Sequence, residues 1–190
     1  MMNFEEIKNQ KIDLTGNSIS SDIVIENRGV VIFGGVIRGN VTIKAEKAVI
    51  EDCKIDGNVT FEGAAHSIIA KCEVNGEIAL KNSCNCVVLL NSARSMTACG
   101  NTNAYIVENT LSSLALEGNN YLLADGNICE SVISSDNVNF NGDNITDTDA
   151  RLEFGADEAL LPHANKELFI GIERDEYISA PDSLEGENIS

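Results

Sequence analysis

The residues of this chain that could do chemistry are six cysteines, two histidines and one group of aspartates. Cys84 and Cys86 form a Cys-x-Cys pair, and Cys99 follows them. In a strand, residues two apart face the same side, so both thiols would point together. A tetrahedral metal site needs four ligands, however, and the sequence offers no second clustered pair. We therefore expect reduced thiols that serve as small buried groups.

The histidines and aspartates show no catalytic spacing. His66 and His163 lie far apart, and no nucleophile-elbow motif accompanies either one. Asp143, Asp147 and Asp149 could share a face and bind Ca²⁺ through oxygen, but they do not match the twelve-residue calcium loop. We expect a solvated acidic corner there. The sequence thus designates no catalytic, cofactor-binding or metal-binding residue.

The elements that must position these residues form a repeat. Three near-copies follow one another in residues 30–81, and their glycines, Gly39, Gly57 and Gly76, are 18 and 19 residues apart. Within each copy the apolar residues alternate with polar ones, which is the period of a strand. Copies this short leave no room for a crossover helix, so their strands must stack as parallel sheets. The repeat therefore predicts a parallel β-helix, an all-β solenoid.

The aligned apolar residues predict the interior of this solenoid. The four predicted columns are Ile32, Ile50 and Ile69; Ile37, Ile55 and Val74; Val41, Val59 and Ile78; and Ile43, Phe61 and Leu80. The pattern continues with more drift after residue 82. There we place Leu122 and Leu123 beneath Tyr105 and Ile106, Ile128 beneath Leu111, and Val132 and Ile133 together beneath Leu114 and Leu116.

The repeat defines the domain organisation. We count about eight coils between residues 11 and 155, each adding roughly 4.8 Å to the stack. Residues 1–10 carry Phe4 and Ile7 and would form an amphipathic N-terminal cap. Residues 156–190 would form a C-terminal cap on the last coil, followed by an acidic tail.

One corner of the coils has a column of its own. Cys53 and Cys72 occupy it in adjacent coils, and Asn91 and Asn109 occupy it next. Stacked asparagines can hydrogen-bond along the stack and to the corner backbone, so we expect an asparagine ladder. A disulfide between the two cysteines is within reach but is poorly suited by parallel side-chain vectors.

The charge of the chain is strongly negative and unevenly placed. Of the formal charge of −17, residues 1–94 contribute −2 (10 basic, 12 acidic) and residues 95–190 contribute −15 (3 basic, 18 acidic). Such a field disfavours direct binding to nucleic acid or to an anionic membrane and favours basic partners or cations, although it could serve solubility alone. The N-terminus shows no secretory signal and no apolar run is long enough to cross a bilayer, so we expect a cytoplasmic protein.

The Gly-Asn-Val and Gly-Glu-Ile strings of residues 30–81 resemble those of the right-handed parallel β-helix superfamily. Among its short members the chain is most similar to bactofilins, bacterial cytoskeletal proteins with coils of this length. The resemblance implies end-to-end assembly through exposed terminal coils, without a nucleotide. The expected caps, the Cys/Asn corner column and the acidic second half depart from that family.

Three hypotheses about function follow. The first is a non-enzymatic scaffold that self-associates or docks a protein partner. The second is an acidic binding module that mimics nucleic acid and occupies a basic protein surface. The third is an enzyme acting on saccharides, which would require converging carboxylates in a cleft along the solenoid.

Overall fold

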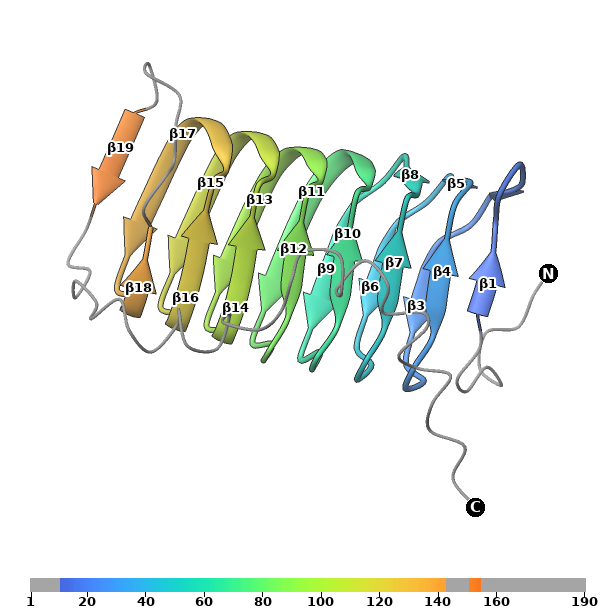
Figure 1. The fold of residues 1–190 in the computed structure, drawn as a ribbon, viewed down its shortest axis with the longest axis horizontal. Helices are drawn as coiled ribbons and strands as arrows, with labels where there is room; N and C mark the ends of the chain where they lie inside the picture. The colour runs from blue at the N-terminus through green and yellow to red at the C-terminus, as the bar shows by residue number, and fades with distance from the viewer. Residues whose placement is uncertain (1–10, 143–150, 155–190) are drawn as a thin grey trace.

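The computed structural model describes residues 11–142 and 151–154, and for the last four only the backbone. The caps expected in residues 1–10 and 156–190, as well as Asp143, Asp147, Asp149 and His163, lie outside the described residues. The described chain is all-β, without a helix, and coils into a parallel β-solenoid of about 7 turns (Figure 1). The predicted fold class is therefore confirmed. The right-handedness taken from the family resemblance stays a prediction.

One wall of the solenoid is a sheet of eight parallel strands, which we call sheet A. It takes one strand from each coil, so that neighbours in space are distant in sequence. The strands, in spatial order, are β1 (Lys11–Asp13), β4 (Val31–Phe33), β7 (Val49–Glu51), β10 (Ile68–Ala70), β12 (Val87–Leu89), β14 (Thr102–Val107), β16 (Asn120–Asp125) and β18 (Val138–Asn141).

The remaining strands form a second parallel sheet, sheet B, which bends around the rest of each coil. In the early coils it consists of two short strands per turn. The two consecutive strands of each coil are β2 (Ser18–Ile19) and β3 (Ile23–Ile25), then β5 (Val36–Ile37) and β6 (Val41–Ile43), then β8 (Lys54–Ile55) and β9 (Val59–Glu62). In later coils a single bent strand replaces each pair: β11 (Glu73–Lys81), β13 (Ser92–Cys99), β15 (Thr110–Glu117) and β17 (Ile128–Ser135), with β19 (Arg151–Phe154) beside β17.

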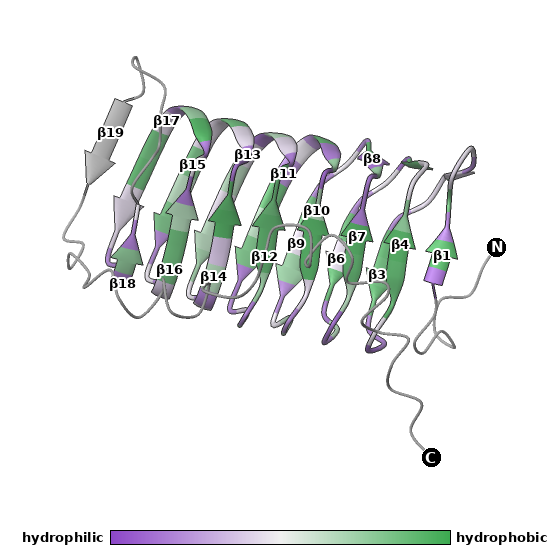
Figure 2. Cartoon of the chain, in the orientation of Figure 1, coloured by the Kyte–Doolittle hydropathy of each residue, from purple (hydrophilic) through white to green (hydrophobic). Residues whose placement is uncertain are grey.

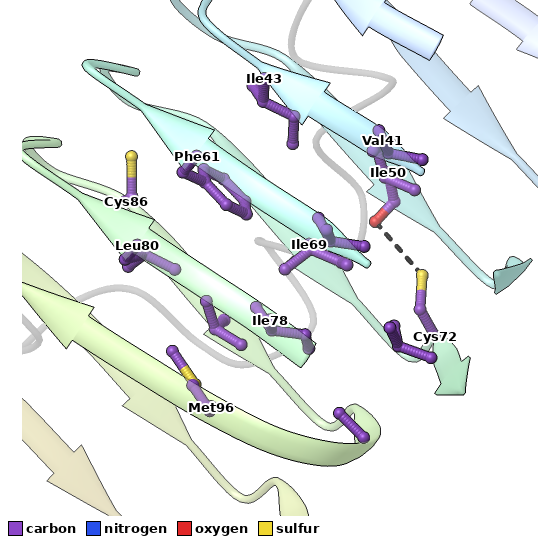
Figure 3. Packing of buried hydrophobic residues seen from close by; sticks show 14 of the residues in the cluster. Val41, Ile43, Ile50, Phe61, Ile69, Cys72, Ile78, Leu80, Cys86 and Met96 are labelled. Atoms are coloured by element: carbon purple, nitrogen blue, oxygen red, sulfur yellow. Dashed lines mark hydrogen bonds between the residues drawn. The ribbon is translucent and has the colours of Figure 1, made fainter. Parts of the chain in front are cut away.

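The core is a set of apolar columns that run along the solenoid axis. The strand register pairs Ile32 with Ile50, Ile50 with Ile69, and Val59 with both Val41 and Ile78. All four columns predicted in residues 30–81 are confirmed by this pairing. Figure 3 shows the interdigitated side chains of this region, and Phe61 is its largest fully buried member. Each such side chain stabilises the fold by about 1.5–3 kcal/mol through burial.

The predicted register is wrong by one residue at three places in the later coils. Tyr105 pairs with Leu123, not with Leu122. Leu111 pairs with Cys129, so Ile128 faces outward beside Thr110. Ile133 pairs with Ala115 and also faces outward, at 52% exposure. Because side chains alternate along a strand, a shift of one residue moves each of them to the opposite face.

The glycine column at one bend of sheet B reflects close backbone approach. A Cβ atom added to Gly57 would lie 2.5 Å from the carbonyl oxygen of Gly39 and 2.7 Å from Oδ1 of Asn40. The same bend is closed by hydrogen bonds along the stack, from the amide of Asn58 to Oδ1 of Asn40 at 3.0 Å and from that of Glu77 to Oδ1 of Asn58 at 2.9 Å. Glycine is required here because one coil lies directly against the next.

This packing predicts unequal tolerance at two glycines. Gly57→Ala should lower the free energy of unfolding by about 3 kcal/mol, because its methyl group would overlap rigid backbone of the preceding coil. Gly63→Asn is the control: Gly63 has φ +64 with open space around it, and Asn82 has φ 48 one coil further on. Asparagine tolerates that conformation, so the control should change stability by less than about 1 kcal/mol. Urea denaturation of both variants measures the difference, and equal losses would contradict this account.

Candidate functional site

The predicted corner column forms an asparagine ladder of three residues: Asn91, Asn109 and Asn127. Nδ2 of Asn91 donates to Oδ1 of Asn109 at 3.0 Å, and Nδ2 of Asn109 donates to Oδ1 of Asn127 at 2.9 Å. The backbone amides of Asn91 and Asn109 also donate to the Oδ1 of the next ladder residue, at 2.9 and 3.0 Å. All three side chains are buried. The ladder thus satisfies corner backbone that water cannot reach.

Cys53 and Cys72 continue this column into the earlier coils, as predicted. Both are free thiols, and Sγ of Cys53 donates to the carbonyl of Glu51 at 3.2 Å while Sγ of Cys72 donates to that of Ala70 at 3.3 Å. The amide of Cys72 donates to Oδ1 of Asn91 at 2.9 Å, which joins the two halves of the column. Its thiol also lies beside the carbonyl of Ile50 (Figure 3). These cysteines are structural parts of the corner.

A second ladder, which the sequence analysis missed, closes the opposite corner. It consists of Asn101, Asn119 and Asn137, with Nδ2 to Oδ1 distances of 2.8 and 2.7 Å. Ser83 continues it into the earlier coil, where its amide donates to Oδ1 of Asn101 at 2.9 Å and its Oγ accepts from the amide of Ala64 at 3.2 Å. The sequence contained a signal for this second ladder, because its asparagines recur every 18 residues, as do those of the first ladder.

The corners require residues in the left-handed backbone region. Leu90 and Glu108, which directly precede ladder residues of the first corner, have φ of 57° and 52°. At the second corner Gly100 and Gly118 precede the ladder residues with φ of 66° and 59°. A bulky residue such as Leu90 costs about 1–2 kcal/mol in this conformation. The buried hydrogen bonds of each ladder offset that cost, at about 1 kcal/mol for each bond.

The thiols of Cys84, Cys86 and Cys99 lie in different environments. Cys84 and Cys86 flank Asn85, which has φ 52°, so the segment is a corner and not a strand. Cys86 is buried, Cys84 is half-buried and Cys99 is exposed. Within residues 11–142, no three side chains of the histidine, cysteine, aspartate and glutamate types converge as a metal site would require.

His66 lies at a corner, as expected, with φ 51°. Its Nε2 is 3.5 Å from Nδ2 of Asn85, and Nδ2 of Asn103 donates to Oδ1 of Asn85 at 3.1 Å. These three residues form an outer polar column, two residues along the chain from the positions of the second ladder. His66 is thus part of the polar network of this corner.

The surface has a shallow depression of about 440 Å³ over β11, β13 and β15. Among the described residues, its charged lining groups are Glu77 and Arg94, and serines and Asn58 provide most of the remaining lining. Oε1 of Glu77 accepts a hydrogen bond from Oγ1 of Thr97 at 2.8 Å. Glycoside hydrolysis uses two opposed carboxylates, whereas this depression provides one.

The acidic residues of the later coils are scattered over the described surface. Residues 95–142 contain five of the 18 acids of residues 95–190, and the other 13 lie in residues 143–190. Two of the five lie at one corner, two at another, and one on the bend of sheet B; they are Glu108 and Asp125, Glu117 and Asp136, and Glu130. They form no continuous stripe of the kind a nucleic-acid mimic would present.

Comparison of the chain with protein-family models, with curated proteins and with solved structures gives no match. The assignment of the fold therefore depends on the strand pairing alone. Among the described residues there is also no helix with the length and apolarity needed to cross a bilayer.

The corner geometry predicts the reactivity of the thiols. Burial raises the pKa of Cys86 and of Cys129 to about 11, and a hydrogen bond with Cys53 together with burial raises that of Cys72. A pKa near 11 leaves roughly one thiol in ten thousand ionised at pH 7. Iodoacetamide at pH 7 should therefore modify Cys99 first, and peptide mass spectrometry would detect it. All six should react in denaturant, and modification of Cys86 as fast as Cys99 in the folded chain would contradict the structure.

The ladders also predict a stability difference between two asparagines. Asn109→Ala removes the acceptor for the amide of Asn91 and the donor to the carbonyl of Val88, at 2.9 Å each, inside a dry corner. We expect a loss of about 3 kcal/mol in the free energy of unfolding, since each orphaned group costs about 1–3 kcal/mol.

Asn120→Ala is the matched control for that substitution. The Asn120 side chain is exposed and accepts one hydrogen bond, from Nδ2 of Asn139 at 3.1 Å. Its removal should cost less than about 1 kcal/mol. Equal effects of the two substitutions in urea denaturation would show that the buried ladder has no special role.

Proposed function

We propose that this protein is a non-enzymatic scaffold that self-associates through the ends of its solenoid. The observation that carries the proposal is the position of the exposed large hydrophobic side chains. Val24 in β3 is 46% exposed, Ile128 and Ile133 in β17 are 50% and 52% exposed, and Val138 in β18 is 42% exposed. All four lie in the first or the last coils of the described stack. Apolar surface exposed near the ends of the stack would be buried by contact with a partner.

The outward columns of sheet B support this assignment. Val24 and Ile133 occupy the same column, Val24 in its first strand and Ile133 in β17, the strand before β19. The residues between them are small or polar: Thr42, Thr60, Ala79, Thr97 and Ala115. In a neighbouring column, Ile128 likewise follows Ser92 and Thr110. In a second copy that continued the solenoid, β19 would separate the two aliphatic positions by one strand, since Glu153 pairs with Ile133.

The unpaired edges of sheet A also favour end-to-end assembly. In the described part of the chain, β1 and β18 end sheet A, and each pairs with a strand on one side only. An unpaired strand edge is a template for pairing with another chain. Contacts between unlike ends are heterologous, and they generate open filaments when the rotation does not close. End-to-end pairing would therefore extend the solenoid into a longer rod.

The resemblance to bactofilins is consistent with this proposal, because it implies assembly through terminal coils in the bacterial cytoplasm. A protein partner that docks on the same ends is the other form of the hypothesis. The scattered acids of residues 95–142 give no support to nucleic-acid mimicry, and the single carboxylate of the depression gives none to saccharide chemistry.

The proposal predicts that a charge at a terminal coil weakens association. Ile128→Asp should raise the dissociation constant of self-association about tenfold, because a half-exposed isoleucine that becomes buried contributes about 1.4 kcal/mol. Thr110→Asp is the matched control, since Thr110 faces outward in the same column one coil earlier. Sedimentation velocity or light scattering over a concentration series measures both.

The direction of assembly can be tested with a variant at the other end. In head-to-tail assembly, Val24→Asp should weaken association as Ile128→Asp does. A mixture of the two variants should then form complexes of limited size, because each retains one intact end. A chain that stays monomeric at every concentration would contradict self-association. An equal effect of Thr110→Asp would show that association does not use the terminal coils.

A further inference from the structure

The outer face of sheet A is apolar, unlike that of sheet B. Its outward side chains form a second hydrophobic cluster, separate from the core: Val31, Val49, Ile68, Ala70, Val87, Leu89, Tyr105 and Leu123. Figure 2 shows the strands of sheet A in the green of hydrophobic residues over much of their length. The cluster extends over six neighbouring strands, from β4 to β16, a span of roughly 24 Å at about 4.8 Å for each strand.

These outward side chains are buried. Val31 and Val49 are each 3% exposed and Val87 is 4% exposed. At outward positions of interior coils on sheet B, Thr42 and Thr60 are only half-buried. On sheet B the outward threonines stay partly accessible, and only the small Ala79 among the neighbouring outward positions is buried. Atoms beyond the wall of the solenoid must therefore cover sheet A.

Two polar residues of the same face behave in the same way. Glu51 points outward from β7 and is 7% exposed, and burial raises its pKa even though Nζ of Lys71 lies 3.6 Å from its Oε1. Tyr105 is also 7% exposed, and burial raises the pKa of its hydroxyl. Among the described residues, however, no strand or helix is layered on sheet A. The described coils do not supply this cover themselves.

We propose that residues 156–180 of the same chain dock along the outer face of sheet A. This segment follows β19 and contains two apolar groups, Leu160-Leu161 and Leu168-Phe169-Ile170. Its 25 residues can reach about 80 Å when extended, well beyond the span of the cluster. The segment of residues 1–10 offers fewer large apolar side chains for a face six strands wide.

The docked segment would act as a strap along the wall of the solenoid. This differs from the expected cap on the last coil, because the contact runs along the stack and reaches the early coils. Lys11 and Lys71 flank the face, and the segment carries six acids against two bases. Opposite charges at the edge of an apolar contact favour one orientation of the segment. The inference does not depend on the proposed scaffold role.

Thiol labelling tests the proposal in the full chain. A cysteine is placed at Val49→Cys, under the proposed strap, or at Val24→Cys, which is 46% exposed on sheet B and serves as the control. Reaction with a maleimide is followed by peptide mass spectrometry, which separates the new site from the native thiols. Val49→Cys should react at least about ten times more slowly than Val24→Cys, because reaction then requires local opening.

Removal of the strap should abolish this protection. In a chain that lacks residues 156–190, Val49→Cys should react as fast as Val24→Cys. Leu168→Asp with Phe169→Asp in the full chain should have the same effect, and this variant decides the matter if the shortened chain fails to fold. Ser183→Asp with Leu184→Asp, beyond the proposed strap, should leave the protection unchanged.

Three outcomes would overturn the proposal. Fast reaction of Val49→Cys in the full chain would show an open face. Protection that survives the loss of residues 156–190, but not that of residues 1–10, would assign the cover to the N-terminal segment. Protection that disappears on dilution would assign it to a second copy of the chain.

Discussion

The structure depends on one constraint: every coil must pair with the next in parallel register, including at its corners. Strands satisfy their backbone groups automatically in such a stack, but corners do not. The ladders of Asn91, Asn109 and Asn127 and of Asn101, Asn119 and Asn137 supply the missing donors and acceptors. Each asparagine serves its own coil and both neighbours, so one side chain type at one position repeats the same solution in successive coils.

The length of the coils changes where the ladders begin. From β7 to β12 the paired residues lie 19 apart, as in Val49 to Ile68 and Ile68 to Val87. From β12 onward they lie 18 apart, as in Val87 to Tyr105. The change coincides with a register shift between β11 and β13, and with the first asparagine of each ladder. Coils with cysteine, alanine or serine corners vary in length, whereas the coils with ladders keep a constant period.

The architecture and the early core columns were predictable from residues 30–81, because glycine and alternating apolar residues repeat there with little change. The later register was not, since apolar matching places Ile128 beneath Leu111. The polar ladder resolves the ambiguity: Asn109 to Asn127 is 18 residues, and the same offset takes Leu111 to Cys129. Buried amides specify register more sharply than aliphatic side chains do, because a one-residue slip leaves them without partners. It could not be predicted that both faces of sheet A are apolar, because a strand such as Val87–Leu89 is apolar throughout and shows no alternation.

The same physics indicates where a function would lie. The interior and the buried corners are occupied by groups whose contacts hold the coils together, so a ligand could not use them without weakening the stack. Outward aliphatic side chains do not hold the coils together in this way. They occur in two places, and they are buried in one and about half exposed in the other. Those of sheet A are buried, whereas those of the terminal coils on sheet B and β18 are about half exposed. Since apolar surface in water is costly, the covered face belongs to the stability of the folded chain, and the open ends are the surfaces that gain most from a partner.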